Sequence, residues 1–215
     1  MSARVILAFG DSNTHGASAI APDGSWWRYG AETRWPTQLA EKLGPDYRVI
    51  EEGLPGRTTC FDDPIEGAHK NGLRVLPALL QTHAPLDLVI LMLGTNDLKA
   101  RFSLEAADIA KAMARLVQEI RALAVGPEGG DPALLIVAPA PIIEIGVPGP
   151  HMAGGAAKSQ QLADFYARLA EQEGAYFFDA GSMAAVDPAD GIHLTPEAHR
   201  TLADRFAEII KGMGR

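Results

Sequence analysis

The chain alternates between short, continuous apolar runs and longer segments with a helical hydrophobic repeat. An apolar run that ends at Gly, Pro, Asn or Asp is typical of a strand buried on both faces of a parallel sheet. Five runs fit this description, namely residues 5–9, 47–50, 88–93, 134–138 and 176–178. We therefore predict five strands.

Helical patterns lie between these strands. Residues 35–43 end before a glycine, and residues 106–124 carry apolar side chains at three- and four-residue spacing. A third helix is expected over about residues 159–173. A fourth begins with Thr195 as N-cap and Pro196 at the first helical position, the pattern typical of a helix start.

The alternation of strands and helices predicts an α/β fold with a single domain over residues 1–215. The expected architecture is a three-layer α/β/α sandwich around a mostly parallel five-stranded sheet, in which ligands bind beyond the carboxyl ends of the strands. The Gly/Pro-rich segments 126–132 and 143–157 are interpreted as loops within this domain. Residues 55–73 are expected to form another long, partly apolar loop.

Composition and charge exclude several classes of partner. Of 215 residues, 47% are hydrophobic and 21% are charged, which is ordinary for a globular protein. A net charge of −8 repels phosphate backbones and anionic lipid, so neither nucleic acid nor a membrane is expected as a partner. The longest apolar stretch, residues 86–93, is far shorter than the roughly 20 residues of a membrane span.

The only cysteine, Cys60, cannot form an internal disulfide, which favours a reducing compartment. A short apolar run leads from Arg4 directly into Gly10 and Asp11, and this leaves no room for a signal peptide. A cytoplasmic location is therefore expected.

Candidate chemistry begins with Gly10-Asp11-Ser12, directly after the first strand. A tight turn there lifts the Ser12 hydroxyl above the sheet edge, as a nucleophile requires. A serine that merely caps the next helix explains the same tripeptide, which is common by chance. The tripeptide alone does not decide between these interpretations.

At the other end of the chain, Asp190 stands three residues before His193. A nucleophilic serine needs a base to take its proton, and the imidazole needs a carboxylate to fix its tautomer and stabilise its cation. Asp190 and His193 supply both groups. The alternative is a histidine that only packs beside Thr195.

Two further loops follow strands and carry groups suited to an oxyanion. Asn96 follows the strand 88–93, so its side-chain amide reaches the same sheet edge as Ser12. Gly56 follows the strand 47–50, and a glycine lets its backbone N–H approach a substrate closely. Each loop alone is also compatible with an ordinary turn.

Taken together, the four segments resemble the sequence blocks of the SGNH (GDSL-like) hydrolase superfamily, which has a flavodoxin-like fold. The resemblance extends from Gly10 to His193 and is closest to the arylesterase and perhydrolase (acyltransferase) branch. The segments that carry this finer likeness are Gly10-Asp11-Ser12, Glu51-Glu52-Gly53-Leu54, Arg57-Thr58-Thr59, Met92-Leu93-Gly94-Thr95-Asn96-Asp97 and Phe178-Asp179-Ala180-Gly181.

The resemblance implies a role for each matching residue. Ser12 would be the nucleophile, His193 the general base and then acid, and Asp190 the partner that orients His193. The oxyanion hole would consist of the Ser12 and Gly56 backbone N–H groups and the Asn96 side chain. The remaining matching carboxylates are interpreted as structural, with Asp11 and Asp97 bracing their loops and Asp179 ending its strand.

The implied function is a serine esterase that hydrolyses short-chain aryl or alkyl esters through an acyl-enzyme, with acyl transfer to alcohols or peroxide as a further reaction. A carbohydrate acetylesterase and a non-catalytic small-molecule or carbohydrate-binding module of the same fold remain alternatives. The superfamily's chemistry needs no cofactor and no metal, and the other histidines show no metal-ligand spacing. Members of this branch form homo-oligomers, so one is expected here.

Two other enzyme classes are disfavoured by missing motifs. An α/β-hydrolase needs Gly-x-Ser-x-Gly, and residues 16–20 lack the last glycine. A dinucleotide-binding enzyme needs Gly-x-Gly-x-x-Gly after the first strand, which is absent. The sequence leaves open whether Pro55 biases the choice between water and another nucleophile, and whether Trp26, Trp27 and Trp35 line the pocket or belong to a core or interface.

Overall fold

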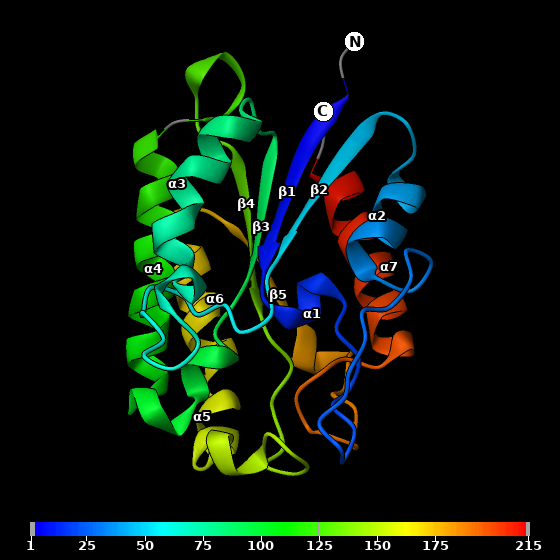
Figure 1. Ribbon diagram of the computed structural model, residues 1–215. Helices are drawn as coiled ribbons and strands as arrows, with labels where there is room; N and C mark the ends of the chain where they lie inside the picture. The colour runs from blue at the N-terminus through cyan, green and yellow to red at the C-terminus, as the bar shows by residue number, and fades with distance from the viewer. Residues whose placement is uncertain (1–2, 124, 214–215) are drawn as a thin grey trace.

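Five parallel strands form one sheet through the middle of the computed structural model, which describes residues 3–123 and 125–213 (Figure 1). The strand order is β2-β1-β3-β4-β5. This confirms the five predicted strands with shifts of a few residues at their ends. The strands are β1 (Arg4–Gly10), β2 (Tyr47–Gly53), β3 (Leu88–Met92), β4 (Ala133–Ala138) and β5 (Tyr176–Asp179).

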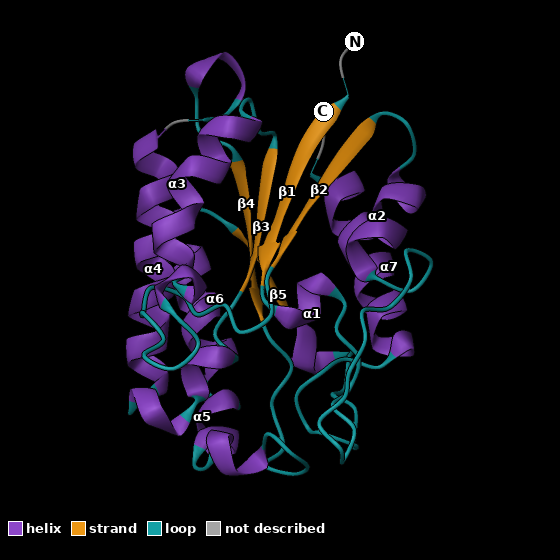
Figure 2. Cartoon of the chain, in the orientation of Figure 1, coloured by secondary structure: helices purple, strands orange, loops and turns teal. Residues whose placement is uncertain are grey.

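Helices cover both faces of the sheet, which confirms the three-layer arrangement (Figures 1 and 2). One face is covered by α3 (Gly72–His83), α4 (Ala106–Leu123) and α6 (Leu162–Glu173), and the other by α2 (Trp35–Leu43) and α7 (Pro196–Gly212). Two short helices, α1 (Ser12–His15) and α5 (Gly155–Ser159), lie near the carboxyl ends of the strands.

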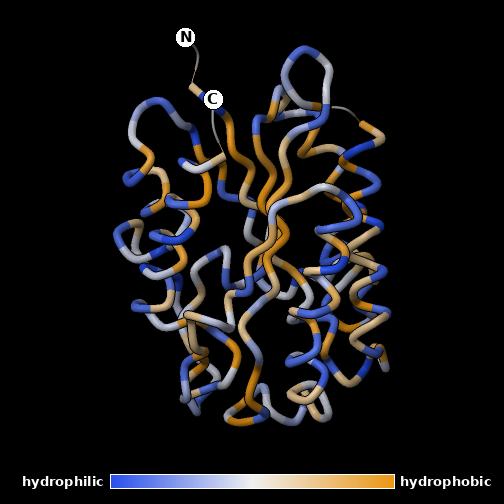
Figure 3. Tube along the Cα trace, turned by 180° about the vertical axis from the view of Figure 1, so that it is seen from behind, coloured by the Kyte–Doolittle hydropathy of each residue, from blue (hydrophilic) through white to orange (hydrophobic). Residues whose placement is uncertain are grey.

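The alternation of side chains along each strand divides the core into two hydrophobic clusters. Leu7 and Phe9 point toward α3, α4 and α6, whereas Ile6 and Ala8 point toward α2 and α7. Both faces of the strands are therefore buried, and the strands form the hydrophobic centre seen in Figure 3. Burial of apolar surface at about 25 cal/mol per Å² is the main force that holds the layers together.

Helix boundaries follow local signals where those signals are strong. The Thr195 hydroxyl accepts a hydrogen bond from the Ala198 N–H at 3.1 Å, as the predicted N-cap requires. Helix α2 has the predicted bounds, and α4 agrees with the prediction as far as Leu123; the last predicted position, 124, lies outside the described residues.

Two predictions about helices need correction. Helix α3 was not predicted, and the loop expected over residues 55–73 ends at Asn71, before this helix. The helix contains Pro77, which removes a backbone donor and weakens the local signal, but Leu76 and Leu80 are buried against the sheet and hold it in place.

The helix predicted over residues 159–173 is interrupted at its start. Helix α5 ends at Ser159, and α6 begins only at Leu162, so the end of the loop expected over 143–157 is helical. The buried Ser159 hydroxyl donates to the Ala156 carbonyl and accepts from the Ile142 N–H at 3.1 Å. A serine that bonds to the backbone in this way competes with a continuous helix.

The order of the strands also locates a crevice. Strand β1 pairs with β2 on one side and β3 on the other, so the direction in which strands are added reverses at β1. Loops at such a point diverge and leave room for a ligand beyond the strand ends. Ser12 follows β1 at this point. Within the described residues, no helix is long and apolar enough to cross a membrane.

Candidate active site

The turn after β1 places Ser12 at the first position of α1. The Asp11 carboxylate caps this helix by accepting from the Asn13 N–H at 2.9 Å. The interpretation of Ser12 as the helix cap is therefore wrong, because Asp11 fills that position. Gly10 makes the turn possible, since a Cβ there would lie 2.0 Å from the Thr14 hydroxyl and 2.8 Å from the Met92 carbonyl oxygen.

Asp190 and His193 form the carboxylate–imidazole pair expected from their spacing. The His193 Nδ1 lies 2.5 Å from Asp190 Oδ2, and Asp190 Oδ1 accepts from the His193 backbone N–H at 3.0 Å. Asp190 also accepts from the N–H groups of Ile20 and Ile192. Nδ1 therefore carries the proton, which leaves Nε2 as the basic nitrogen.

The environment of Asp190 keeps its carboxyl group ionised. Burial raises the pKa of this group. The hydrogen bond and positive charge of His193 and the hydrogen bonds from backbone N–H groups together outweigh burial and lower the pKa to about 2. The charge on Asp190 is thus present throughout the neutral range. It lies where it can stabilise a positive charge on His193.

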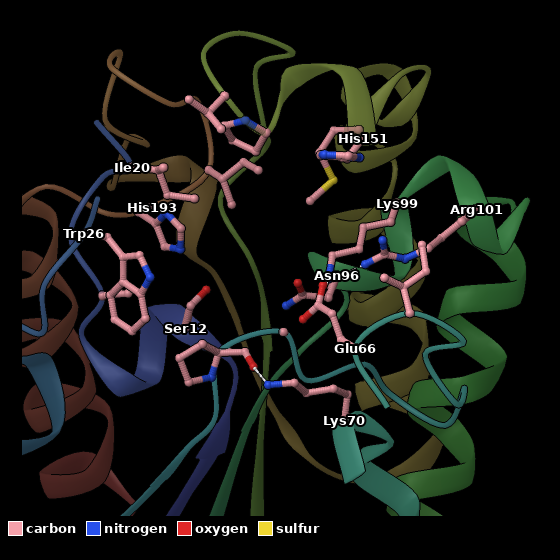
Figure 4. A pocket seen from close by; sticks show the side chains of 18 residues that line it. Ser12, Ile20, Trp26, Glu66, Lys70, Asn96, Lys99, Arg101, His151 and His193 are labelled. Atoms are coloured by element: carbon pink, nitrogen blue, oxygen red, sulfur yellow. Dashed lines mark hydrogen bonds and ion pairs between the residues drawn. The ribbon is translucent and has the colours of Figure 1, made fainter. Parts of the chain in front are cut away.

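Ser12 and His193 face each other in one pocket of about 550 Å³. Figure 4 shows the His193 ring beside the Ser12 hydroxyl. Gly56 and Asn96 line the same pocket, so the four loops singled out in the sequence meet there. Asp190 does not line it and lies fully buried behind His193.

Three residues that line the pocket, Ser12, Gly56 and Asn96, carry N–H donors. Asn96 lies in a 3₁₀ turn over Asn96–Leu98, and its side-chain nitrogen is held 3.4 Å from an Asp11 carboxylate oxygen. The Gly56 backbone has φ +82°, a conformation that favours glycine. Among the described residues, the backbone N–H groups of Ser12 and Gly56 donate to no protein acceptor. They are therefore free to bind an oxyanion.

Three buried charged residues brace these loops. Asp97 accepts from the Thr59 backbone N–H at 3.1 Å and thereby ties the Gly56 loop to the Asn96 loop. Arg57 donates to the Gly10 carbonyl at 2.9 Å and stacks over the Phe9 ring. Burial raises the pKa values of Asp11 and Asp97 to about 6 and lowers that of Arg57 to about 10.

One wall of the pocket carries a cluster of charges that the sequence analysis missed. Glu66 pairs with Lys99 at 2.5 Å and with Arg101 at 2.7 Å, and Lys70 donates to the Pro55 carbonyl at 2.7 Å. Figure 4 shows these side chains on the side of the pocket opposite Trp26 and His193. No motif joins them, because they come from two separate segments, residues 66–70 and 99–101.

The opposite wall is mainly apolar and includes Trp26, whose side chain is 46% exposed. Trp35 is fully buried against Phe206, so it belongs to the core. Trp27 is 60% exposed and does not line the pocket. Of the three tryptophans, Trp26 is thus the one placed to contact a substrate.

The remaining candidates from the sequence lie outside the pocket. Asp179 accepts from the Gly181 N–H at 2.9 Å at the end of β5, in agreement with a structural role. Cys60 is partly buried away from the pocket, and burial raises the pKa of its thiol. In residues 3–123 and 125–213, no three His, Cys, Asp or Glu side chains cluster in a way suited to a metal ion.

Comparison with known proteins places this geometry in context. The family model described as the GDSL-like Lipase/Acylhydrolase family matches residues 8–201. The aryl esterase of M. smegmatis is 42% identical, with a TM-score of 0.92 over 98% of this chain and 99% of that chain. Est24, a carbohydrate acetylesterase from Sinorhizobium meliloti, is 40% identical, with a TM-score of 0.93 over 98% of this chain and 100% of that one.

A more distant structure, from the lipolytic protein G-D-S-L family of Veillonella parvula, is 15% identical, with a TM-score of 0.69 over 97% of this chain and 99% of that chain. At this identity the likeness shows the fold alone. No curated protein matches the chain in a sequence comparison.

Proposed function

The chain belongs to the GDSL-like lipase/acylhydrolase family and is a carboxylic ester hydrolase, and we propose that Ser12 is its nucleophile and that it cleaves short-chain acyl esters. One observation carries this proposal. His193, paired with Asp190, lies beside Ser12 in a pocket that also holds the unpaired N–H groups of Ser12 and Gly56 and the side-chain amide of Asn96.

The proposed reaction has two steps on the same residues. His193 Nε2 takes the proton from Ser12 Oγ as this oxygen attacks the ester carbonyl carbon, and Asp190 stabilises the imidazolium. His193 then gives the proton to the leaving alcohol, which leaves an acyl group on Ser12. In the second step His193 activates a water that releases the acid and restores Ser12.

The oxyanion of each tetrahedral intermediate is bound by Ser12 N–H, Gly56 N–H and Asn96 Nδ2. These donors are placed by a helix start, a left-handed glycine and a 3₁₀ turn, all braced by buried contacts. Because the donors are already oriented, stabilising the charge requires little reorganisation during the reaction.

We propose aryl and short alkyl esters as the substrates. Ile192, Met152 and Trp26 contribute to a mainly apolar pocket lining, which suits an uncharged acyl or aryl group. The likeness to the M. smegmatis aryl esterase supports the same choice.

Acyl transfer to an alcohol or to peroxide is proposed as a further reaction of the acyl-enzyme. Pro55 lines the pocket directly before Gly56, so its fixed backbone angle influences the space where water or a competing nucleophile enters. The test is the ratio of transfer to hydrolysis with 1-propanol in the parent and in Pro55→Ser. An unchanged ratio would remove Pro55 from this role.

A carbohydrate acetylesterase is the second candidate. The charged wall formed by Glu66, Lys70, Lys99 and Arg101 offers donors and acceptors for sugar hydroxyls, and the exposed Trp26 ring offers a stacking surface. The likeness to Est24 points the same way. In this case Arg101→Met, which leaves the contacts of the Gly56 loop in place, should lower kcat/KM for an acetylated sugar while leaving that for p-nitrophenyl acetate unchanged.

The first experiment compares p-nitrophenyl acetate turnover by the parent, Ser12→Ala and the control Ser182→Ala, whose hydroxyl is on the surface. Activity should disappear only in Ser12→Ala, and a fluorophosphonate should label the parent and the control but not this variant. An inert, unlabelled parent would instead favour a binding module of the same fold.

We further propose that the protein forms a homo-oligomer in a reducing, cytoplasmic compartment. Exposed apolar side chains gather near the pocket mouth, and a second copy can cover them; they include Trp26, Ile65 and Val147. The single cysteine is in keeping with the proposed compartment.

A further inference from the structure

The residue after the proposed nucleophile contacts the loop that carries the proposed base. Asn13 follows Ser12 in α1, and its side chain is buried. Its Oδ1 accepts from the Leu194 backbone N–H at 2.9 Å, and its Nδ2 donates to the Ile192 carbonyl oxygen at 3.2 Å. One amide therefore binds the backbone on both sides of His193.

We propose that Asn13 is a positioning residue that holds His193 at the correct place relative to Ser12. This inference rests on the proposed function, because it gives Asn13 a purpose only if Ser12 and His193 exchange a proton. Asn13 touches no substrate in this role. It acts through its hydrogen bonds to the backbone of Ile192 and Leu194.

Two residues of segment 11–20 hydrogen-bond to the His193 loop, Asn13 and Ile20, and the Ile20 N–H donates to the Asp190 side chain rather than to the backbone beside His193. Asp190 bonds to the N–H groups of Ile192 and His193, which shapes the loop from within. The Ile143 N–H donates to the Gly191 carbonyl, and the Asp187 N–H donates to the His193 carbonyl. Among the described residues, both hydrogen bonds between α1 and residues 190–194 go through Asn13.

The adjacency of Ser12 and Asn13 makes this link short. Any shift of α1 that moves Ser12 also moves Asn13, and the two hydrogen bonds carry the His193 loop along with it. The Asp11 carboxylate fixes Asn13 in turn by accepting from its backbone N–H. The distance for proton transfer is therefore kept by a contact between segments about 180 residues apart in sequence.

The test compares steady-state kinetics of the parent with Asn13→Leu and with a control, Leu116→Ala. Leucine has a similar size but makes neither hydrogen bond. We expect kcat to fall by about 100-fold, because misplacement of a catalytic group by about 1 Å has an effect of this size. KM should change much less than kcat, because Ile192 is the only wall residue whose backbone Asn13 holds, and the rest of the pocket lining comes from other contacts.

Leu116→Ala opens a cavity in the core on α4, away from the pocket, and lowers stability without touching the loop. It should keep the parent's kcat at a temperature where both variants are folded. If Asn13→Leu is less stable but keeps the parent's kcat, Asn13 is merely structural and the proposal fails. An inert parent would overturn the proposed function instead, which separates the two failures.

Asn13→Asp provides a second variant that should fold. An aspartate can still accept from the Leu194 N–H, but it can donate to the Ile192 carbonyl only when protonated. The Asp11 and Asp190 carboxylates accept from the backbone N–H groups of Asn13 and Ile192, and they oppose ionisation of the new carboxyl group. The activity of Asn13→Asp relative to the parent should therefore rise as pH falls from 8 toward 5. If the ratio of Asn13→Asp activity to parent activity does not change with pH, the proposed positioning role of Asn13 is contradicted.

A readout independent of turnover completes the test. Amide hydrogen exchange at Leu194 should be faster in Asn13→Leu than in the parent and in Leu116→Ala, because its acceptor is lost. Exchange at an unchanged rate would show that Asn13 does not hold this loop, whatever the kinetics.

Discussion

At the scale of single residues, the pocket depends on a few polar contacts that leave little freedom. Asp190 uses both carboxylate oxygens to hold His193 and its loop, and Asp11 caps α1 while also lying near Asn96. The backbone N–H groups of Ser12 and Gly56 are left without a protein acceptor, and with the Asn96 amide they are the donors of the proposed oxyanion hole. Which donors in the pocket have no protein acceptor therefore depends on the hydrogen bonds that the neighbouring side chains already make.

Asn96→Ala tests the side-chain donor of the proposed oxyanion hole. We expect kcat for p-nitrophenyl acetate to fall by about 10²–10³, the usual effect of losing one such donor. KM should change much less, because the interaction is stronger in the transition state than with bound ester. Retention of full kcat by a folded Asn96→Ala would exclude this residue from the oxyanion hole.

At the scale of elements, short capping motifs decide where the helices begin and therefore where the loops point. The Asp11 cap places Ser12 at the start of α1, and the Thr195 cap, two residues after His193, starts α7 at Pro196. The Gly56 loop has no such cap and is held by Arg57 and Asp97.

Thr195→Ala tests the cap of α7. Loss of the hydrogen bond to the Ala198 N–H should lower the free energy of unfolding by about 0.5–2 kcal/mol, measured by urea titration. The control is Thr82→Ala, near the end of α3, where the hydroxyl donates to the Ala78 carbonyl and caps nothing. Equal effects of the two substitutions would show that the Thr195 hydroxyl adds no capping energy.

At the scale of the whole molecule, buried ionisable groups couple folding to pH. Burial raises the pKa of Asp97 from 3.8 to about 6, so the folded state holds this proton more tightly than the unfolded state. Its contribution to stability therefore grows as pH falls from 6 to 4. Asp11 acts in the same direction, and the buried His199, whose pKa burial lowers to about 4, acts in the opposite one.

Asp97→Asn should remove one of these contributions. As pH rises from 4 to 6, the parent loses the contribution of Asp97 and the variant does not. The difference in unfolding free energy, variant minus parent, should therefore increase by up to about 1.4 kcal/mol per pH unit, measured by urea titration at several pH values. The control is Asp62→Asn, because Asp62 is exposed and its hydrogen bonds with Arg74 and Asn71 lower its pKa. A constant difference between parent and Asp97→Asn across this range would contradict the prediction.

The proposed oligomer is also a property of the whole molecule. Ile65 is 73% exposed beside the pocket, which favours its burial by a second copy. Ile65→Asp should shift the sedimentation coefficient toward that of a monomer, because a charge is costly to bury in an apolar interface. Glu197→Gln, on the surface at the start of α7, should leave it unchanged. A monomeric parent would disprove the oligomer.

What the sequence by itself determined is what local interactions control. The apolar runs specified the five strands, Thr195 specified the start of α7, and the order of strands and helices implied that the loops after the strands share one edge of the sheet. The pairing of Asp190 with His193 was also predictable, because a spacing of three residues in a tight loop keeps both side chains together. These features depend on neighbours in the chain.

Only the tertiary structure decided the features that join distant segments. The start of α6 depends on a bond between Ser159 and Ile142, and the charged wall joins Glu66 to Lys99 and Arg101. The two hydrogen bonds of the Asn13 side chain join residues about 180 positions apart in the chain. A hydrogen bond or ion pair between distant residues forms only after the sheet has brought their loops together, so no local pattern in the sequence records it.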